Sequence, residues 1–166
     1  MVFSSALFVF YFLPVFLLAY LATPPPCRNW TALAGSLAFY AWGAPLFIFV
    51  LIASSLADHF IARKIGRLYD STLRRRWLWV SIALNLGLLG YFKYANFFVE
   101  NINSLLVNFG AQPAKWAEVA LPIGISFFTF QKLSYVIDVY NRRMPALEKA
   151  RDVLLYIALF PQLIAG

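Results

Sequence analysis

The chain has 166 residues, of which 62% are hydrophobic and only 13% are charged, and its net charge at pH 7 is +7. A soluble domain carries about 25% charged residues, so the composition excludes an ordinary soluble domain. The apolar residues gather in long runs, and a membrane span needs ~20 of them. The sequence therefore predicts an all-α polytopic membrane protein, with about five to six membrane helices and an amphipathic interfacial helix.

The first apolar run, Ala6 to Thr23, contains no charge and is long enough to span a membrane. Pro14 lies within it, and a membrane helix tolerates this because neighbouring groups can satisfy the freed carbonyl. A cleaved signal peptide is the alternative, but such peptides begin with basic residues and this chain does not. The run Pro24-Pro25-Pro26 then ends the helix, because proline lacks the N–H that the ladder needs.

The second apolar stretch, Trp30 to Phe60, is interrupted at Gly43-Ala44-Pro45. Unbroken, it would be too long for one span. We expect two helices, Trp30–Trp42 and Pro45–Ala62, joined by a tight turn. Proline is tolerated at the start of the second helix, where its missing N–H costs little.

A strongly basic segment, Arg63 to Arg76, follows and holds six basic residues and one acidic residue. We expect it to be a loop. Four further segments come after it: an apolar helix at Trp77–Tyr91, a mixed segment at Phe92–Glu118 that contains the amphipathic helix, an apolar helix at Leu121–Tyr140, and a last apolar run at Val153–Gly166.

The basic residues predict how the chain is oriented. Cytoplasmic loops carry an excess of Lys and Arg, so we place the Arg63–Arg76 loop in the cytoplasm. Counting back two helices puts Arg28 inside and the N-terminus outside. Counting forward puts Phe92–Glu118 outside and, if Leu121–Tyr140 crosses, the basic residues from Arg142 to Arg151 inside. We therefore interpret the positive net charge as a signal that sets the orientation of the chain and attracts anionic lipid headgroups. It does not predict nucleic-acid binding.

Three residues of types that often form sites have simpler interpretations here. Cys27 is the one cysteine, which excludes an internal disulfide, and we interpret it as a spectator thiol. Asp58 and His59 are adjacent and so do not share a helix face. We expect His59 to have an interfacial or structural role, and one His with one Asp makes an incomplete metal site.

Polar side chains also interrupt the apolar segment Leu121–Tyr140. Pro122 and Gly124 would disrupt a regular helix start. Several later polar residues recur at spacings of three and four, which predicts a polar stripe that faces a cavity or another helix. A polar seam between helices remains the alternative. Lys93, just beyond the fourth helix, is either a snorkelling lysine or part of the same lining.

Five blocks of the sequence resemble the amino-terminal part of the membrane-bound O-acyltransferase family, in its alginate O-acetyltransferase branch: MVFSSALFVFYFLPVF, SLAFYAW, GYFKYANFF, LPIGISFFTFQKLSYVIDVY and LFPQLIAG. The resemblance implies a helical membrane body around a tunnel, as one domain of which residues 1–166 form the amino-terminal part. It also implies a bacterial inner-membrane location.

The implied activity is transfer of an acetyl group from a thioester donor, acetyl-CoA or an acyl carrier, to a hydroxyl of an exported polysaccharide. Membrane lipid and accessory acetylation proteins are the other implied partners, and no bound cofactor is implied. We assign the tunnel lining to Lys93, Ser126, Gln131, Ser134, Tyr135 and Asp138, without a catalytic step for any of them.

The family's signature histidine lies in the later half of such proteins, so we expect it beyond Gly166 and assign no catalytic residue in this chain. His59 does not match its position. The chain ends within an apolar run, which suggests a fragment that is inactive alone. The alternatives are D-alanyl transfer to teichoic acid by a sister branch, and a non-catalytic scaffold or transporter part, for which matched repeats would be expected.

Overall fold

The computed structural model describes residues 6–108, 112, 119–122 and 124–165. Within these ranges the chain is all-α, with no strand. The elements in chain order are the π-helix η1 (Phe8–Phe12), α1 (Leu13–Ala22), the 3-10 helix η2 (Pro25–Cys27), α2 (Arg28–Gly43), α3 (Phe47–Arg67), α4 (Ser71–Asn108), α5 (Ile125–Tyr140), α6 (Ala150–Ala158) and α7 (Phe160–Ala165).

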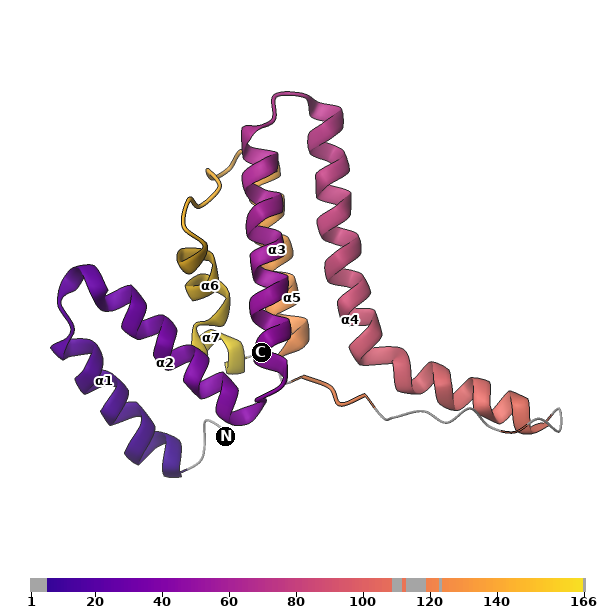
Figure 1. Cartoon of the computed structure of the whole chain (residues 1–166), viewed down its shortest axis with the longest axis horizontal. Helices are drawn as coiled ribbons and strands as arrows, with labels where there is room; N and C mark the ends of the chain where they lie inside the picture. Colours follow the sequence, from indigo (N-terminus) through magenta and orange to yellow (C-terminus); the bar gives the residue numbers. More distant parts are fainter. Residues whose placement is uncertain (1–5, 109–111, 113–118, 123, 166) are drawn as a thin grey trace.

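Three helices form the centre of the molecule. The helices α3, α4 and α5 pack against one another, and α6 packs against α2 and α3 (Figure 1). Leu51, Ile65, Phe128, Val136 and Ile157 are fully buried and belong to one core cluster that joins α3, α5 and α6. This core fixes the ends of the helices that build the site described below.

A second cluster of phenylalanines attaches the N-terminal hairpin to the C-terminal end of the described chain. Phe8, Phe39 and Phe160 are buried together, with ring centroids 5.2 to 5.9 Å apart. By contrast α1 buries none of its residues, and Val15 and Leu18 are among its exposed apolar side chains. An uncovered apolar helix face of this kind is typical of a surface that meets lipid or another protein.

The break predicted near Gly43 is confirmed, since α2 ends at that residue and α3 begins at Phe47. The prediction that Arg63 to Arg76 form a loop is wrong, because α3 continues to Arg67 and α4 starts at Ser71. Lys64 and Arg67 stand in the last turn of α3, where cations favour the negative end of the helix dipole.

Asp70 explains the early start of α4. Its carboxylate accepts hydrogen bonds from the backbone N–H groups of Thr72, at 2.7 Å, and Leu73, at 3.4 Å. An Asp at this position satisfies amide groups that a helix start leaves unpaired. The basic residues from Arg74 to Arg76 are therefore helical, and the connection between α3 and α4 is only residues 68–70.

The helix α4 also joins two segments that the sequence analysis separated. The predicted helix at Trp77–Tyr91 and the predicted amphipathic helix after it form one helix of 38 residues. It bends part-way along, and its second half runs away from the bundle (Figure 1). Phe97, Phe98 and Leu105 are exposed there, so this half keeps the apolar surface expected of an interfacial helix.

Among the described helices, α4 alone is long and apolar enough to cross a membrane by length and composition. At a rise of 1.5 Å per residue it is about 57 Å long. The hydrocarbon core of a bilayer is about 30 Å thick, so only part of α4 would lie within it.

Two other predicted segments differ in detail. The helix predicted from Leu121 begins at Ile125, after Gly124, whose φ of 74° is left-handed. The last apolar run, predicted as one segment, is divided at Leu159 into α6 and α7. Pro161 lies in the first turn of α7, where its missing N–H is tolerated, and it could not have continued α6.

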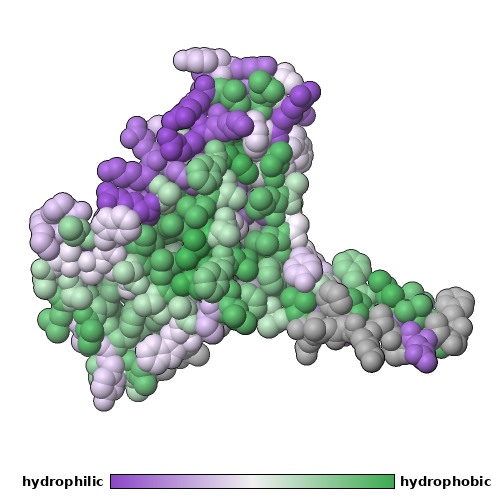
Figure 2. Space-filling model, viewed as in Figure 1, coloured by the Kyte–Doolittle hydropathy of each residue, from purple (hydrophilic) through white to green (hydrophobic). Residues whose placement is uncertain are grey.

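Hydrophilic side chains gather at one end of the bundle and apolar ones cover its flanks (Figure 2). The same view of the ribbon places the turn between α3 and α4, and the segment after α5, at that end (Figure 1). We call it the polar end. The two basic segments, which the charge rule predicts to lie on one side of a membrane, therefore lie together.

Candidate functional site

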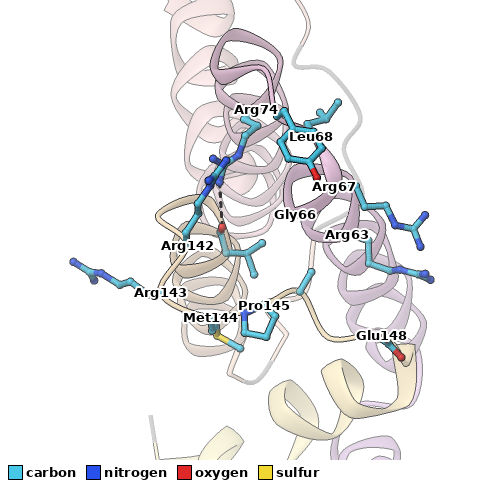
Figure 3. Close-up of a pocket in the computed structure, with 13 residues that line it drawn as sticks. Arg63, Gly66, Arg67, Leu68, Arg74, Arg142, Arg143, Met144, Pro145 and Glu148 are labelled. Atoms are coloured by element: carbon cyan, nitrogen blue, oxygen red, sulfur yellow. Dashed lines mark hydrogen bonds between the residues drawn. The ribbon is translucent and has the colours of Figure 1, made fainter.

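A cavity of about 660 Å³ lies at the polar end, between the last turns of α3, the first turns of α4 and residues 142–148 after α5 (Figure 3). We call it the basic pocket. Its charged lining residues are Arg63, Arg67, Arg74, Arg142, Arg143 and Glu148. Arginines outnumber the one glutamate in this lining, so the pocket favours a negatively charged ligand.

Two contacts hold the segment after α5 against the helices. A Cβ atom on Gly66 would lie 3.3 Å from the Cβ of Ala146, so the segment packs closely on α3 at this point. The backbone N–H of Leu147 donates to the hydroxyl of the buried Tyr135, at 3.0 Å. The wall of the pocket is therefore fixed to both α3 and α5.

The end of α5 turns through a left-handed residue. The N–H of Arg142 donates to the carbonyl of Val139 at 3.2 Å, and the N–H of Arg143 donates to that of Asp138 at 2.9 Å. This pair of bonds is the Schellman motif, whose left-handed position is usually glycine. Here it is Arg142, with φ 58°.

Arg74 joins the start of α4 to the end of α5. Its guanidinium donates to the carbonyls of Val139 and Tyr140 and lies over the Tyr140 ring, 5.4 Å from the centroid. Cations near these carbonyls are favoured by the negative end of the helix dipole. Only 9% of the residue is exposed, and its Nε finds no hydrogen-bond partner among the described residues.

The remaining arginines of the pocket are largely uncompensated. Arg143 pairs with Asp138 at 3.5 Å, and its side chain points away from the pocket in Figure 3. None of the ion pairs among the described residues involves Arg63, Arg67 or Arg142. These three guanidinium groups are therefore free of a carboxylate partner within the part of the chain that the structure covers.

A second polar feature, the buried network, lies inside the bundle. The fully buried carboxylate of Asp58 on α3 accepts hydrogen bonds from Ser81 Oγ, at 2.5 Å, and Asn85 Nδ2, at 2.7 Å, both on α4. Lys132 Nζ on α5 lies 3.8 Å from the same carboxylate and is also fully buried. One carboxylate thus links the three central helices.

Other buried polar atoms near this network have no hydrogen-bond partner in the described part of the chain. They include Ser55 Oγ, His59 Nδ1, Asn85 Oδ1 and Thr129 Oγ1. His59 is buried, as Asp58 is. Within the described residues no three His, Cys, Asp or Glu side chains group closely enough to hold a metal ion.

Sequence reasoning missed the network because it weighed Asp58 only against its neighbour His59. Lys132 lies far from Asp58 in the sequence, so no local spacing pairs the two residues. A usable signal was present in α4, where Ser81 and Asn85 are four residues apart within an apolar run and so share a helix face.

The predicted stripe on α5 does not share one surface. Ser134 is exposed and Tyr135 is buried. Gln131 is half-buried and donates to Gln162 of α7, at 3.1 Å, while the half-buried Asp138 pairs with Arg143 at the polar end.

The other two predicted lining residues lie apart from these. Ser126 is half-buried near the start of α5, and Lys93 is exposed on α4, 5.6 Å from the ring centroid of Tyr94. The tunnel-lining role of all six residues stays a prediction.

No family model matches the chain, and no solved structure matches it. Among curated proteins it is 42% identical over 167 residues to the probable alginate O-acetylase AlgI of Azotobacter vinelandii, covering the whole chain and 34% of that protein. The homologue of the same name from Pseudomonas aeruginosa is also 42% identical over 167 residues, with 32% of its length covered. The peptidoglycan O-acetyltransferase of Helicobacter pylori is 31% identical over 196 residues, with 36% covered. The chain thus spans about a third of the length of these relatives.

Proposed function

We propose, from the premise that the chain is homologous over its whole length to the alginate O-acetylases, that it works as part of a membrane O-acetyltransferase acting on an exported polysaccharide. The homology confirms the resemblance that the sequence blocks predicted. The relatives' names differ in the glycan, alginate or peptidoglycan, but agree in the transfer of acetyl to oxygen. This agreement favours acetyl transfer over the D-alanyl alternative.

The proposed location is the bacterial inner membrane, with several crossings. The apolar length of α4 and the exposed apolar face of α1 support a membrane setting. The helices α2 and α5 have 16 residues each, about 24 Å at 1.5 Å per residue, and so would cross only part of the bilayer core. Five to six crossing or partly crossing helices remain our proposal.

The polar end is proposed to face the cytoplasm, because arginine-rich ends of membrane helices stay on that side. The thioester donor, acetyl-CoA or an acyl carrier, would then approach at the basic pocket. The polysaccharide would approach from the opposite end, past the proposed lining residues of α5. The catalytic base, by the family resemblance, would come from outside this chain, and accessory acetylation proteins would complete the system.

A chimeric enzyme tests this proposal. The matched segment of the Azotobacter vinelandii relative is replaced by this chain, and the chimera is expressed in an alginate-producing strain that lacks its own O-acetylase. We expect O-acetyl ester on the secreted alginate well above the level of the strain without enzyme, measured by NMR of the purified polymer.

The control for this experiment is the amount of protein in the membrane, followed with a tag common to the chimera and the unaltered relative. A chimera that reaches the membrane in normal amount but leaves alginate without acetyl ester would contradict the proposed function.

A further inference from the structure

The basic pocket has features of a built anion site beyond its net charge. Arg142 follows α5 and Arg74 lies on α4, and both line one cavity. Figure 3 shows the side chain of Arg142 rising along the side of the pocket where Arg74 lies. Guanidinium groups from separate elements resemble the way proteins surround a phosphate, which they bind through paired N–H groups.

The left-handed backbone of Arg142 indicates that a side chain is needed at this position. A left-handed residue with a Cβ is unfavourable relative to glycine, and glycine is the usual residue of this helix ending. The Arg142 side chain makes no ion pair with the described carboxylates that would stabilise it. Strained residues without a structural partner are characteristic of ligand sites.

Arg74 gives a second, independent observation. Two of its hydrogen bonds go to the end of α5, but its Nε is buried beside the cavity without a partner. The guanidinium is hydrogen-bonded to neutral carbonyls, and none of the ion pairs among the described residues neutralises its charge. Phosphate oxygens are strong, charged acceptors and suit this set of donors best.

We propose that the basic pocket binds a phosphate group, held by Arg142 with Arg74 at its inner wall. Two sources carry this chemistry: the headgroup of an anionic lipid, since the pocket adjoins the apolar flanks, and the phosphates of a soluble ester such as the thioester donor. The link to the donor rests on the proposed function, whereas phosphate binding itself does not.

The test uses the whole chain in dodecyl maltoside, a detergent without phosphate. Binding of coenzyme A is measured by calorimetry, with phosphate-free pantetheine as the control. Binding of phosphatidylglycerol is measured by native mass spectrometry, with diacylglycerol as the control. At least one phosphate-bearing probe should bind when its control does not, and which one binds identifies the source.

The variants separate a site from general positive charge. Arg142→Gly should weaken binding about tenfold, as expected for one lost charge-assisted bond. Arg143→Gln removes the same charge beside Arg142, but its side chain points away, so its effect should stay below about twofold. Arg142→Gly should unfold at the same or a higher temperature, which excludes loss of fold as the cause.

Two results would overturn the proposal: neither probe binds in preference to its phosphate-free control, or Arg143→Gln weakens binding as much as Arg142→Gly does. Neither result depends on acetyl transfer. A chimera without activity, combined with binding that is sensitive to Arg142, would refute the proposed function and leave the phosphate site standing.

Discussion

Asp58 and Lys132 show how single residues hold the centre of this molecule. Both are fully buried, and the carboxylate is shared among Ser81, Asn85 and Lys132. A buried charge is tolerated when it is paired and hydrogen-bonded, and it becomes costly when its partner is removed. The network therefore specifies how α3, α4 and α5 meet.

We predict that Asp58→Ala lowers the free energy of unfolding by about 3–5 kcal/mol, because it leaves the Lys132 ammonium buried without a counter-charge. Replacing both residues with apolar ones, Asp58→Leu with Lys132→Met, should recover most of the loss. Thermal unfolding in detergent measures both variants. A double variant as unstable as Asp58→Ala would show that the pair is not the reason for the instability.

At this scale the sequence allowed the polar residues to be found but not their partners. Asp58 and Lys132 were recognisable as ionisable groups within apolar runs, which are rare and conspicuous. Their pairing depends on how α3 packs on α5, which local sequence does not encode. The left-handed conformation of Arg142 was likewise unpredictable, since the usual glycine signal is missing.

At the scale of the helices, the contact between α1 and α2 depends on one glycine. A Cβ atom on Gly35 would lie 2.5 Å from two ring carbons of Phe16, a distance that side-chain atoms do not tolerate. Gly87 on α4 has open space around the same position, with nothing within 4 Å. Gly35 and Gly87 therefore differ in whether a Cβ atom has space, and one serves as the control for the other.

We predict effects of opposite sign for these positions. Gly35→Ala should destabilise the protein by about 1–3 kcal/mol, because it overpacks the contact with Phe16. Gly87→Ala should stabilise it by up to about 1 kcal/mol, because alanine favours the helix over glycine. Thermal unfolding of the two variants side by side is the measurement, and destabilisation by Gly87→Ala, or its absence in Gly35→Ala, would refute this contact.

Helix boundaries were predictable where the sequence contains a breaker. The break near Gly43 and the left-handed residue before α5 follow from glycine and proline chemistry. The high charge of Arg63–Arg76 led to the wrong prediction of a loop. This segment is mostly helical, because its cations favour the end of α3 and Asp70 caps α4. The continuity of α4 across the two predicted segments was not predicted, because the sequence does not show where such a helix bends. Tertiary packing alone decides the position of the bend.

At the scale of the whole molecule, the polar end and the apolar flanks give the bundle a direction (Figure 2). The family resemblance was readable from sequence blocks, and the curated relatives confirm it. The gathering of two basic segments into one pocket was not predicted, although the charge rule placed both on one side. We propose that this end, with its basic pocket, faces the cytoplasm.

Cysteine accessibility tests that claim most directly. In a Cys27→Ser background, Ser71→Cys at the polar end and Ser104→Cys on the far half of α4 are treated with a membrane-impermeant maleimide on intact spheroplasts. We predict that Ser104→Cys is labelled at once and that Ser71→Cys is labelled only after the membrane is permeabilised. Efficient labelling of Ser71→Cys from outside would contradict the cytoplasmic placement of the basic pocket.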